Sequence, residues 1–206
     1  HSETLAPLMA RAIEKSGLQL FDMDLVAVTH GPGSFTGVRI GVALAKGVAQ
    51  PMEIPCLGVS TLEAAAFGQN RQGELILACM DARRDQLYAA FFEGDKQAPK
   101  RLRDDAALSA EEAAKILIDY QRPAVVTGDG APVFLSYLRK NNIDLPVYMP
   151  PGESYYQRAS FTARAAEYEI LHTGRTPVSP KFLAPVYLRM PQAERERKKR
   201  LERSKS

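Results

Sequence analysis

The 206-residue sequence has few of the residues on which catalytic and metal-binding sites are commonly built. It contains three histidines, at positions 1, 30 and 172, whose spacing matches no pattern of metal ligands. Its two cysteines, Cys56 and Cys79, lie far apart within apolar runs. This arrangement excludes a disulfide framework and is typical of a reducing compartment. We therefore expect two buried, unreactive thiols, no metal or cofactor on this chain, and a cytoplasmic location.

Long apolar segments are also missing. No window approaches the roughly 18 uninterrupted apolar residues of a membrane span, so we predict no membrane association. The opening HSETLAPLMA lacks the basic region and apolar core of a signal peptide. With 45% apolar and 25% charged residues, the composition is ordinary for a globular protein.

The net charge of +3 is concentrated at the C-terminus. Residues 191–206 hold seven Lys or Arg and three Glu, a net +4, which leaves 20 basic and 21 acidic residues elsewhere. A charge run of this kind is usually a solvated helical tail. Alternatively, its basic side chains would contact RNA phosphates. The sequence leaves both interpretations open.

Strand-like and helix-like apolar patterns alternate along the chain, which predicts an α/β fold. The pattern changes at Glu74, where two strands flank a polar turn. We therefore expect a first lobe over 1–72, a second over 73–190, and a basic tail over 191–206. Buried-strand patterns occur at 25–28, 57–59, 75–80, 87–92 and 124–127, with an edge-like segment at 145–148. Helical patterns occur at 5–13, 34–49 and 62–67, from Ser109, after Pro132 and at 160–172.

The segment HGPGSFTGVRIG at 30–41 joins a strand to a helix and is rich in small residues. It departs from a phosphate-binding loop because Val38, not lysine, follows Gly37. It departs from a dinucleotide fingerprint because Thr36 stands where glycine is required. A helix start attracts anions only weakly by itself. Ser34 is better explained as the N-cap of the helix, with its hydroxyl bound to a free backbone amide.

The helix predicted over 34–49 is almost wholly apolar or small. Gly37, Gly41 and Ala45 recur along it every four residues. Glycine inside a helix costs about 1 kcal/mol relative to alanine, so the stripe indicates a gain from close approach of another backbone. Two interpretations stay open: the stripe packs on the chain's own sheet, or part of the helix docks a partner.

An ATP-using enzyme is the alternative class of function. Its candidate groups are Asp81 with Arg83, and Gly128-Asp129-Gly130, which follow predicted strands. Turns need such residues for backbone reasons, and we favour for Asp81 and Arg83 either local bonding or contacts that hold the two lobes together. No G-x-S-x-G nucleophile motif occurs, since Phe35 and Thr36 intervene between Ser34 and Gly37.

The chain resembles the bacterial TsaB family, also called YeaZ, in segments that follow the family's order. These segments are HSETLAPLM at 1–9, GPGSFTGVRIGVALAKGVA at 31–49, MDARRDQLYAAFF at 80–92 and APVYLR at 184–189. The SFTGxRxG core is the most specific of them. The resemblance implies an actin/Hsp70/sugar-kinase-like (ASKHA) fold of two related lobes. Members normally open with a strand carrying Asp-Thr-Ala and a hairpin, so we expect this first lobe to lack its opening strands.

The resemblance also implies a function. Members lack a working nucleotide site and pair with the catalytic relative TsaD through first-lobe helices. With TsaD and the small ATPase TsaE, they make N6-threonylcarbamoyladenosine in tRNAs that read codons starting with A. We therefore predict a non-catalytic subunit, with ATP and metal held by TsaD and TsaE. A tRNA would be contacted indirectly or through the basic tail.

The partner-binding residues predicted on this basis lie on the first two helices. They are Leu5, Leu8, Met9, Gly37, Gly41, Leu44 and Ala45. A self-contained homodimer through the same helices is the further alternative, because one apolar face serves both kinds of pairing.

Overall fold

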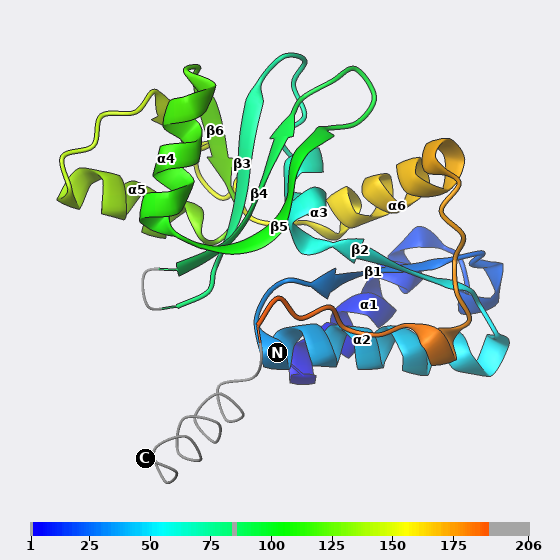
Figure 1. Ribbon diagram of the computed structural model, residues 1–206. Helices are drawn as coiled ribbons and strands as arrows, with labels where there is room; N and C mark the ends of the chain where they lie inside the picture. Colours follow the sequence, from blue (N-terminus) through cyan, green and yellow to red (C-terminus); the bar gives the residue numbers. More distant parts are fainter. Residues whose placement is uncertain (1, 84–85, 190–206) are drawn as a thin grey trace, which may run out of the picture.

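The computed structural model describes residues 2–83 and 86–189, which form an α/β arrangement around two sheets (Figure 1). The predicted α/β class is therefore confirmed. The predicted basic tail over 191–206 lies outside the described residues. The boundary predicted near residue 72 falls in the connection between α3 and β3.

The first sheet pairs β1 (Val26–Gly31) parallel with β2 (Cys56–Ser60). One face is covered by α2 (Phe35–Ala49), and the other by α3 (Thr61–Phe67) and α6 (Ala159–Thr173). Because both faces are covered, both strands begin with a run of apolar residues, as parallel strands usually do. The short helices η1 (Leu20–Asp22) and η2 (Gln50–Met52) precede β1 and follow α2.

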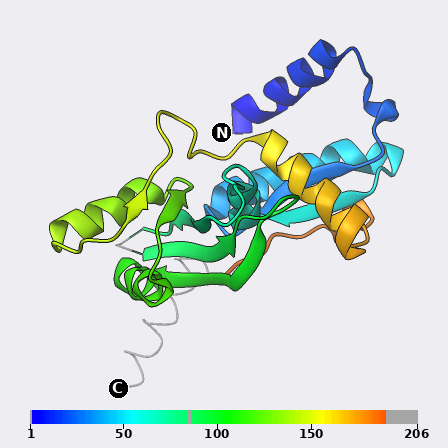
Figure 2. The ribbon, with the colours of Figure 1, turned by 90° about the horizontal axis from the view of Figure 1, so that it is seen from above.

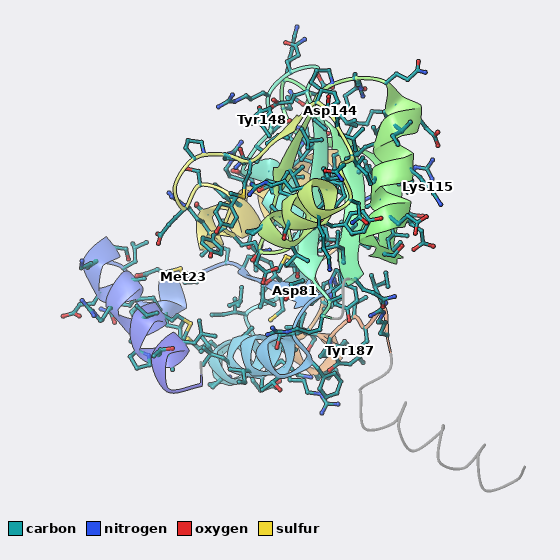
Figure 3. The ribbon with its side chains drawn as sticks, turned by 90° about the vertical axis from the view of Figure 1, so that its left-hand side faces the viewer. Met23, Asp81, Lys115, Asp144, Tyr148 and Tyr187 are labelled. Carbon is teal, nitrogen blue, oxygen red and sulfur yellow. The ribbon has the colours of Figure 1, made fainter. Side chains whose placement is uncertain are left out.

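The N-terminal helix α1 (Ser2–Ser16) stands apart from the body of the molecule. Figures 2 and 3 show it beside α2 rather than over a sheet. Most of its described side chains are consequently exposed to solvent.

The second sheet has the strand order β5-β4-β3-β6-β7. The strand β4 (Gln86–Glu93) pairs antiparallel with both β3 (Leu75–Asp81) and β5 (Lys100–Ser109). On the other side of β3, the strands β6 (Ala124–Thr127) and β7 (Val147–Tyr148) extend the sheet in parallel. Alternate residues of β3 enter different clusters, Leu75 on one face and Ile76 on the other. Both faces of this strand are therefore buried.

Two helices cover one face of the second sheet and α3 covers the other. The two are α4 (Ala110–Tyr120) and α5 (Ala131–Lys140). On the opposite face, Leu62 of α3 packs against Ile76 and Phe92. The other side of α3 packs through Phe67 against β2 and α6. This seven-residue helix is therefore shared by both sheets.

After α6 the chain returns along the first sheet and α2. We call residues 174–189 the C-terminal segment; it includes η3 (Pro180–Phe182). Val178 bridges Cys56 antiparallel, and Leu183 enters the core beside α2. Lys46 Nζ donates to the carbonyl oxygens of residues 181 and 183, each at 3.1 Å. The segment thereby holds α2 against the sheet.

The N-cap of α4 is a place where the stabilising effect of a capping serine can be measured. Ser109 Oγ accepts from the backbone N–H of Glu112 at 3.1 Å, and Glu112 Oε2 accepts from that of Ser109 at 2.7 Å. Substituting Ser109→Ala is expected to lower the free energy of unfolding by about 1 kcal/mol, measured by urea denaturation. The control is Ser136→Ala, an exposed serine inside α5, for which a change within about 0.5 kcal/mol is expected. Equal effects of the two substitutions would contradict the capping role.

Candidate functional site

The turn from β1 into α2 is held tightly by the C-terminal segment. Val186 N–H donates to the carbonyl of His30 at 2.7 Å. Gly31 has φ +126°, and a Cβ at this position would lie 2.2 Å from the Val186 carbonyl oxygen. Only glycine therefore allows this close approach. Ser34 Oγ accepts from Gly37 N–H at 3.3 Å and caps α2.

The stripe of small residues on α2 faces this chain's own structure. A Cβ on Gly37 would lie 3.4 Å from Ser34 Cβ, and one on Gly41 would lie 3.8 Å from a methyl of Val28 in β1. Ala45 is 6% exposed and belongs to the core beneath α2. The structure therefore places Ala45 away from any surface open to a partner, and Gly41 opposite β1. The internal-packing interpretation therefore accounts for Gly41 and Ala45, whereas Gly37 meets only the N-cap residue of its own helix.

A different stripe of α2 faces solvent. Ala43 and Gly47 are exposed, and Leu44 between them is half-buried. No atom outside the helix lies within 4 Å of where a Gly47 Cβ would stand. Small exposed side chains on a regular helix leave room for another helix to approach closely.

The neighbouring helix α1 adds apolar side chains. Leu8 is 58% exposed and Leu5 is 39% exposed, whereas Met9 is half-buried. We group six exposed or half-buried apolar or small residues of the two helices under the name α1–α2 face. Its residues are Leu5, Leu8, Met9, Ala43, Leu44 and Gly47.

Two exposed apolar side chains in the short helices η1 and η2 were missed from the sequence. Phe21 in η1 is 68% exposed, and Met52 in η2 is 44% exposed. Both occur in short connections without a clear period, so local periodicity gave no sign that they would be exposed. They extend the apolar character of this part of the molecule.

Arg39 holds the C-terminal segment. Its guanidinium carbon lies 3.9 Å from the centre of the Phe35 ring, and its Nε donates to Tyr187 Oη at 2.9 Å. The rings of Phe35 and Tyr187 are themselves 4.8 Å apart. Arg39 therefore makes an intramolecular contact that fixes the end of the described chain beside the start of α2.

A cavity of about 340 Å³ lies between the start of α2, the end of β3 and the C-terminal segment. Figure 3 shows Asp81 at the end of the second sheet that faces α2. Asp129 accepts from the Asp81 N–H at 2.9 Å, and Asp81 accepts from the Arg83 N–H at 2.7 Å. Burial raises the pKa of Asp129, and the charge of Asp81 raises it further. The local-bonding interpretation of Asp81 and Arg83 is thus confirmed.

Across residues 2–83 and 86–189, no group of three or more His, Cys, Asp or Glu side chains is placed to hold a metal ion. Within the same ranges, no helix combines the length and apolar character needed to cross a bilayer.

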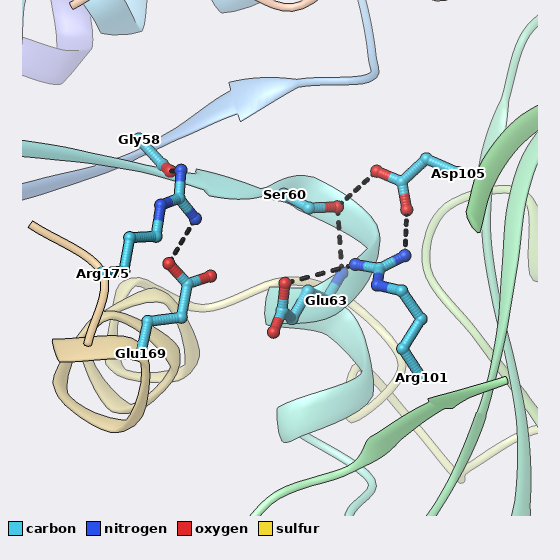
Figure 4. A network of polar contacts seen from close by, with 7 residues as sticks. All are labelled: Gly58, Ser60, Glu63, Arg101, Asp105, Glu169 and Arg175. Carbon is cyan, nitrogen blue, oxygen red and sulfur yellow. Dashed lines mark hydrogen bonds and ion pairs between the residues drawn. The ribbon is translucent and has the colours of Figure 1, made fainter. Parts of the chain in front are cut away.

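The first turn of α3 is the point where β2, β5 and α6 meet (Figure 4). Ser60 Oγ accepts from Glu63 N–H at 3.3 Å, which caps α3, and donates to Asp105 of β5 at 2.6 Å. Arg101 of β5 donates to Asp105 and, at 3.2 Å, to Glu63. Two side chains of the edge strand β5 therefore bind the two polar side chains of this turn.

A third ion pair lies beside the two that Arg101 makes. Glu169 of α6 accepts from Arg175 of the C-terminal segment, and Arg175 also donates to the carbonyl of Gly58 in β2. We call the five charged residues of these three ion pairs the α3 cluster: Glu63, Arg101, Asp105, Glu169 and Arg175. Four segments contribute to it, so no single stretch of sequence indicated the cluster.

The sequence is similar to proteins of tRNA threonylcarbamoyladenosine biosynthesis. The family model described as TsaD, tRNA N6-adenosine threonylcarbamoyltransferase, matches residues 1–166. The tRNA threonylcarbamoyladenosine biosynthesis protein TsaB of Escherichia coli is 40% identical over 98 residues, 47% of this chain and 42% of that protein. That match therefore spans less than half of the relative's length. The protein of the same name in Bacillus subtilis is 29% identical over 194 residues, 94% of this chain and 82% of the relative.

Solved structures share the fold. One is described as an uncharacterized protein with similarity to peptidase YEAZ from Pseudomonas aeruginosa. It is 25% identical with a TM-score of 0.75, and the match covers 92% of this chain and 84% of that one. A structure described as YeaZ from the same organism is 24% identical with a TM-score of 0.74, covering 91% and 84%. The predicted two-lobed ASKHA-like fold is confirmed.

Proposed function

Because this chain belongs to the tRNA N6-adenosine threonylcarbamoyltransferase (TsaD) family and is a homologue of the TsaB (YeaZ) proteins, we propose that it takes part in tRNA threonylcarbamoyladenosine biosynthesis. Its role is that of a non-catalytic subunit that docks a TsaD-like catalytic subunit. A TsaE-like ATPase acts with this pair, and ATP and metal are bound by those two proteins. The tRNA is held by the catalytic subunit, with or without the basic tail.

The observation that carries this proposal is the α1–α2 face. Leu5 and Leu8 project from a helix that stands apart from the body, and Gly47 leaves open space on the adjacent helix. Exposed apolar side chains on neighbouring helices gain free energy when a partner covers them, at roughly 25 cal/mol per Å². Binding then stabilises whichever conformation of the catalytic subunit pairs best with this face.

The cavity between the lobes has features that favour the alternative, an ATP-using enzyme. The N-terminus of α2 and the carboxylates of Asp81 and Asp129 line it. Asp129 accepts from the backbone amide of the last residue of β3, and Asp81 accepts from a backbone amide of the β3–β4 connection, which supports a structural use of both carboxylates. Titration of the isolated chain with magnesium-ATP in a calorimeter tests the alternative. Saturable binding that Asp129→Asn removes would favour the enzyme.

Gly47→Leu tests the docking surface. The added side chain points into open space, so the fold is kept and helix propensity at this position improves by up to about 1 kcal/mol. Close approach of a partner helix is blocked instead. Calorimetric titration with the TsaD-like subunit of the same organism is expected to show at least a tenfold rise in Kd, about 1.4 kcal/mol.

The control is Ala163→Leu at an exposed position of α6, which is expected to leave Kd unchanged. Unaltered affinity of Gly47→Leu would show that the partner docks elsewhere. Sedimentation of the same variants distinguishes pairing between two copies of this chain from pairing with the TsaD-like subunit. If Gly47→Leu removes self-association but leaves TsaD binding intact, the α1–α2 face serves only pairing between copies.

A further inference from the structure

The α3 cluster contains more carboxylates than guanidinium groups. Three of its members, Glu63, Asp105 and Glu169, are acids, and two, Arg101 and Arg175, are bases. With every group ionised the cluster has a net charge of −1. Glu169 is only 5% exposed, and burial of an uncompensated charge is costly. A proton on one carboxylate removes that charge.

Glu169 is the acid that the geometry selects for this proton. Asp105 accepts from both Ser60 and Arg101, and the more exposed Glu63 accepts from Arg101. Glu169 instead shares its one charged partner, Arg175, with the carbonyl of Gly58. Burial raises the pKa of Glu169, the nearby Glu63 carboxylate raises it further, and Arg175 opposes both.

We propose that Glu169 is a proton-dependent lock between α6 and α3. When protonated, its carboxyl group becomes a donor, and the acceptor that we assign to it is the carboxylate of Glu63, which belongs to the same network in the first turn of α3 (Figure 4). The C-terminal segment, α6, α3 and β5 are then joined through one chain of side-chain contacts. When Glu169 releases its proton to solvent, two carboxylates face each other and repel, and this link opens. No other bond changes.

Opening of the lock affects more than the two helices. The residues after α6 form the C-terminal segment, which packs Leu183 beneath α2 and binds His30 through Val186. Loss of the α6–α3 link therefore loosens the support of α2. The lock is a property of the isolated chain and does not depend on the identity of a docking partner.

The charged and titratable groups around Glu169 come from four other segments: Glu63 from α3, Arg101 and Asp105 from β5, Arg175 from the C-terminal segment, and His30 from β1. A raised Glu169 pKa means that the folded state binds the proton more tightly. Its stabilisation is complete below the ordinary pKa of 4.5 and is lost as pH rises through the folded pKa.

The titration of His30 changes the stability of the fold with pH in the opposite direction. Burial lowers its pKa, and the charge of Arg175 lowers it further. The folded state therefore binds a proton at His30 less well than the unfolded state. The stabilisation that neutral His30 gives the fold is complete above its ordinary pKa of 6.5 and is lost as the pH falls below that value. A test must consequently resolve the two sites.

The test combines a site-resolved titration with a pair of variants. Carbon-13 NMR of the full chain is expected to show the Glu169 carboxyl titrating above 4.5. Hydrogen exchange of α6 amides, corrected for intrinsic rates, is expected to show the opening constant rising with pH, by up to about tenfold per unit. Glu169→Gln removes this dependence because glutamine keeps a donor toward Glu63. Glu167→Gln, at an exposed position of the same helix, leaves it as in the wild type.

A Glu169 midpoint at or below 4.5 would overturn the proposal, as would a Glu169→Gln protein with the wild-type dependence on pH. If Glu169→Gln does not fold, Glu63→Gln provides the second variant. Removal of the Glu63 charge is expected to lower the Glu169 midpoint. An unmoved midpoint would show that the two carboxyl groups are not linked.

Discussion

Replacing Leu62 by alanine is expected to lower the free energy of unfolding by about 2–5 kcal/mol. Leu62 is fully buried in the cluster through which α3 packs on the second sheet, beside Ile76, Phe92 and Val125. Truncation removes apolar contacts on a helix that both lobes share, and its neighbours are fixed in strands. Urea denaturation followed by circular dichroism measures the change.

The matched control is Leu171→Ala on α6, where the side chain is 68% exposed. A change within about 0.5 kcal/mol is expected there. If Leu62→Ala cost no more than this control, α3 would not be the packing element that joins the two sheets. A second transition in the Leu62→Ala unfolding curve would show the lobes separating, since α3 also packs on β2 and α6.

The second large effect is expected at Gly128, where β6 ends. This residue has φ +94°, and a Cβ would lie 2.1 Å from the carbonyl oxygen of Cys79 in the central strand β3. Gly128→Ala therefore combines backbone strain of about 1–3 kcal/mol with a backbone overlap that costs about as much again. We expect the free energy of unfolding to fall by about 3 kcal/mol or more.

Gly152→Ala separates the two causes. Gly152 has φ +60°, but no atom lies within 4 Å of where its Cβ would be placed. Only the left-handed backbone is penalised there, by roughly 1–2 kcal/mol. Similar losses for both variants, measured by the same urea denaturation, would mean that β3 and β6 shift apart easily. The packing between them would then be looser than the structure shows.

Local signals predicted much of the architecture. Serine residues at the starts of three helices, Ser34, Ser60 and Ser109, act as caps because a short hydroxyl side chain reaches a free amide in any context. The unbroken apolar run at 75–80 became a strand buried on both faces, because α4 and α5 cover one face of the sheet and α3 covers the other. Each of these outcomes depends on a few adjacent residues.

Other features depend on contacts between distant residues and were not predictable. The strand β5 was missed because KRLRDDAALS mixes charges without alternation, and those charges are used at the edge of the sheet to bind α3. The sequence of an apolar helix such as α2 does not show which side is buried. Contacts with β1 and the C-terminal segment determine which residues of α2 face inward and which face outward. The Arg39–Tyr187 contact joins residues 148 positions apart.

The outer strands of the second sheet resist pairing with strands of other molecules. The strand β5 carries charges and register shifts, and β7 has only two residues. Charged side chains, irregular register and short length all disfavour the extension of a sheet from one molecule to the next. Association that increases with concentration is therefore expected at the α1–α2 face rather than along the edges of this sheet.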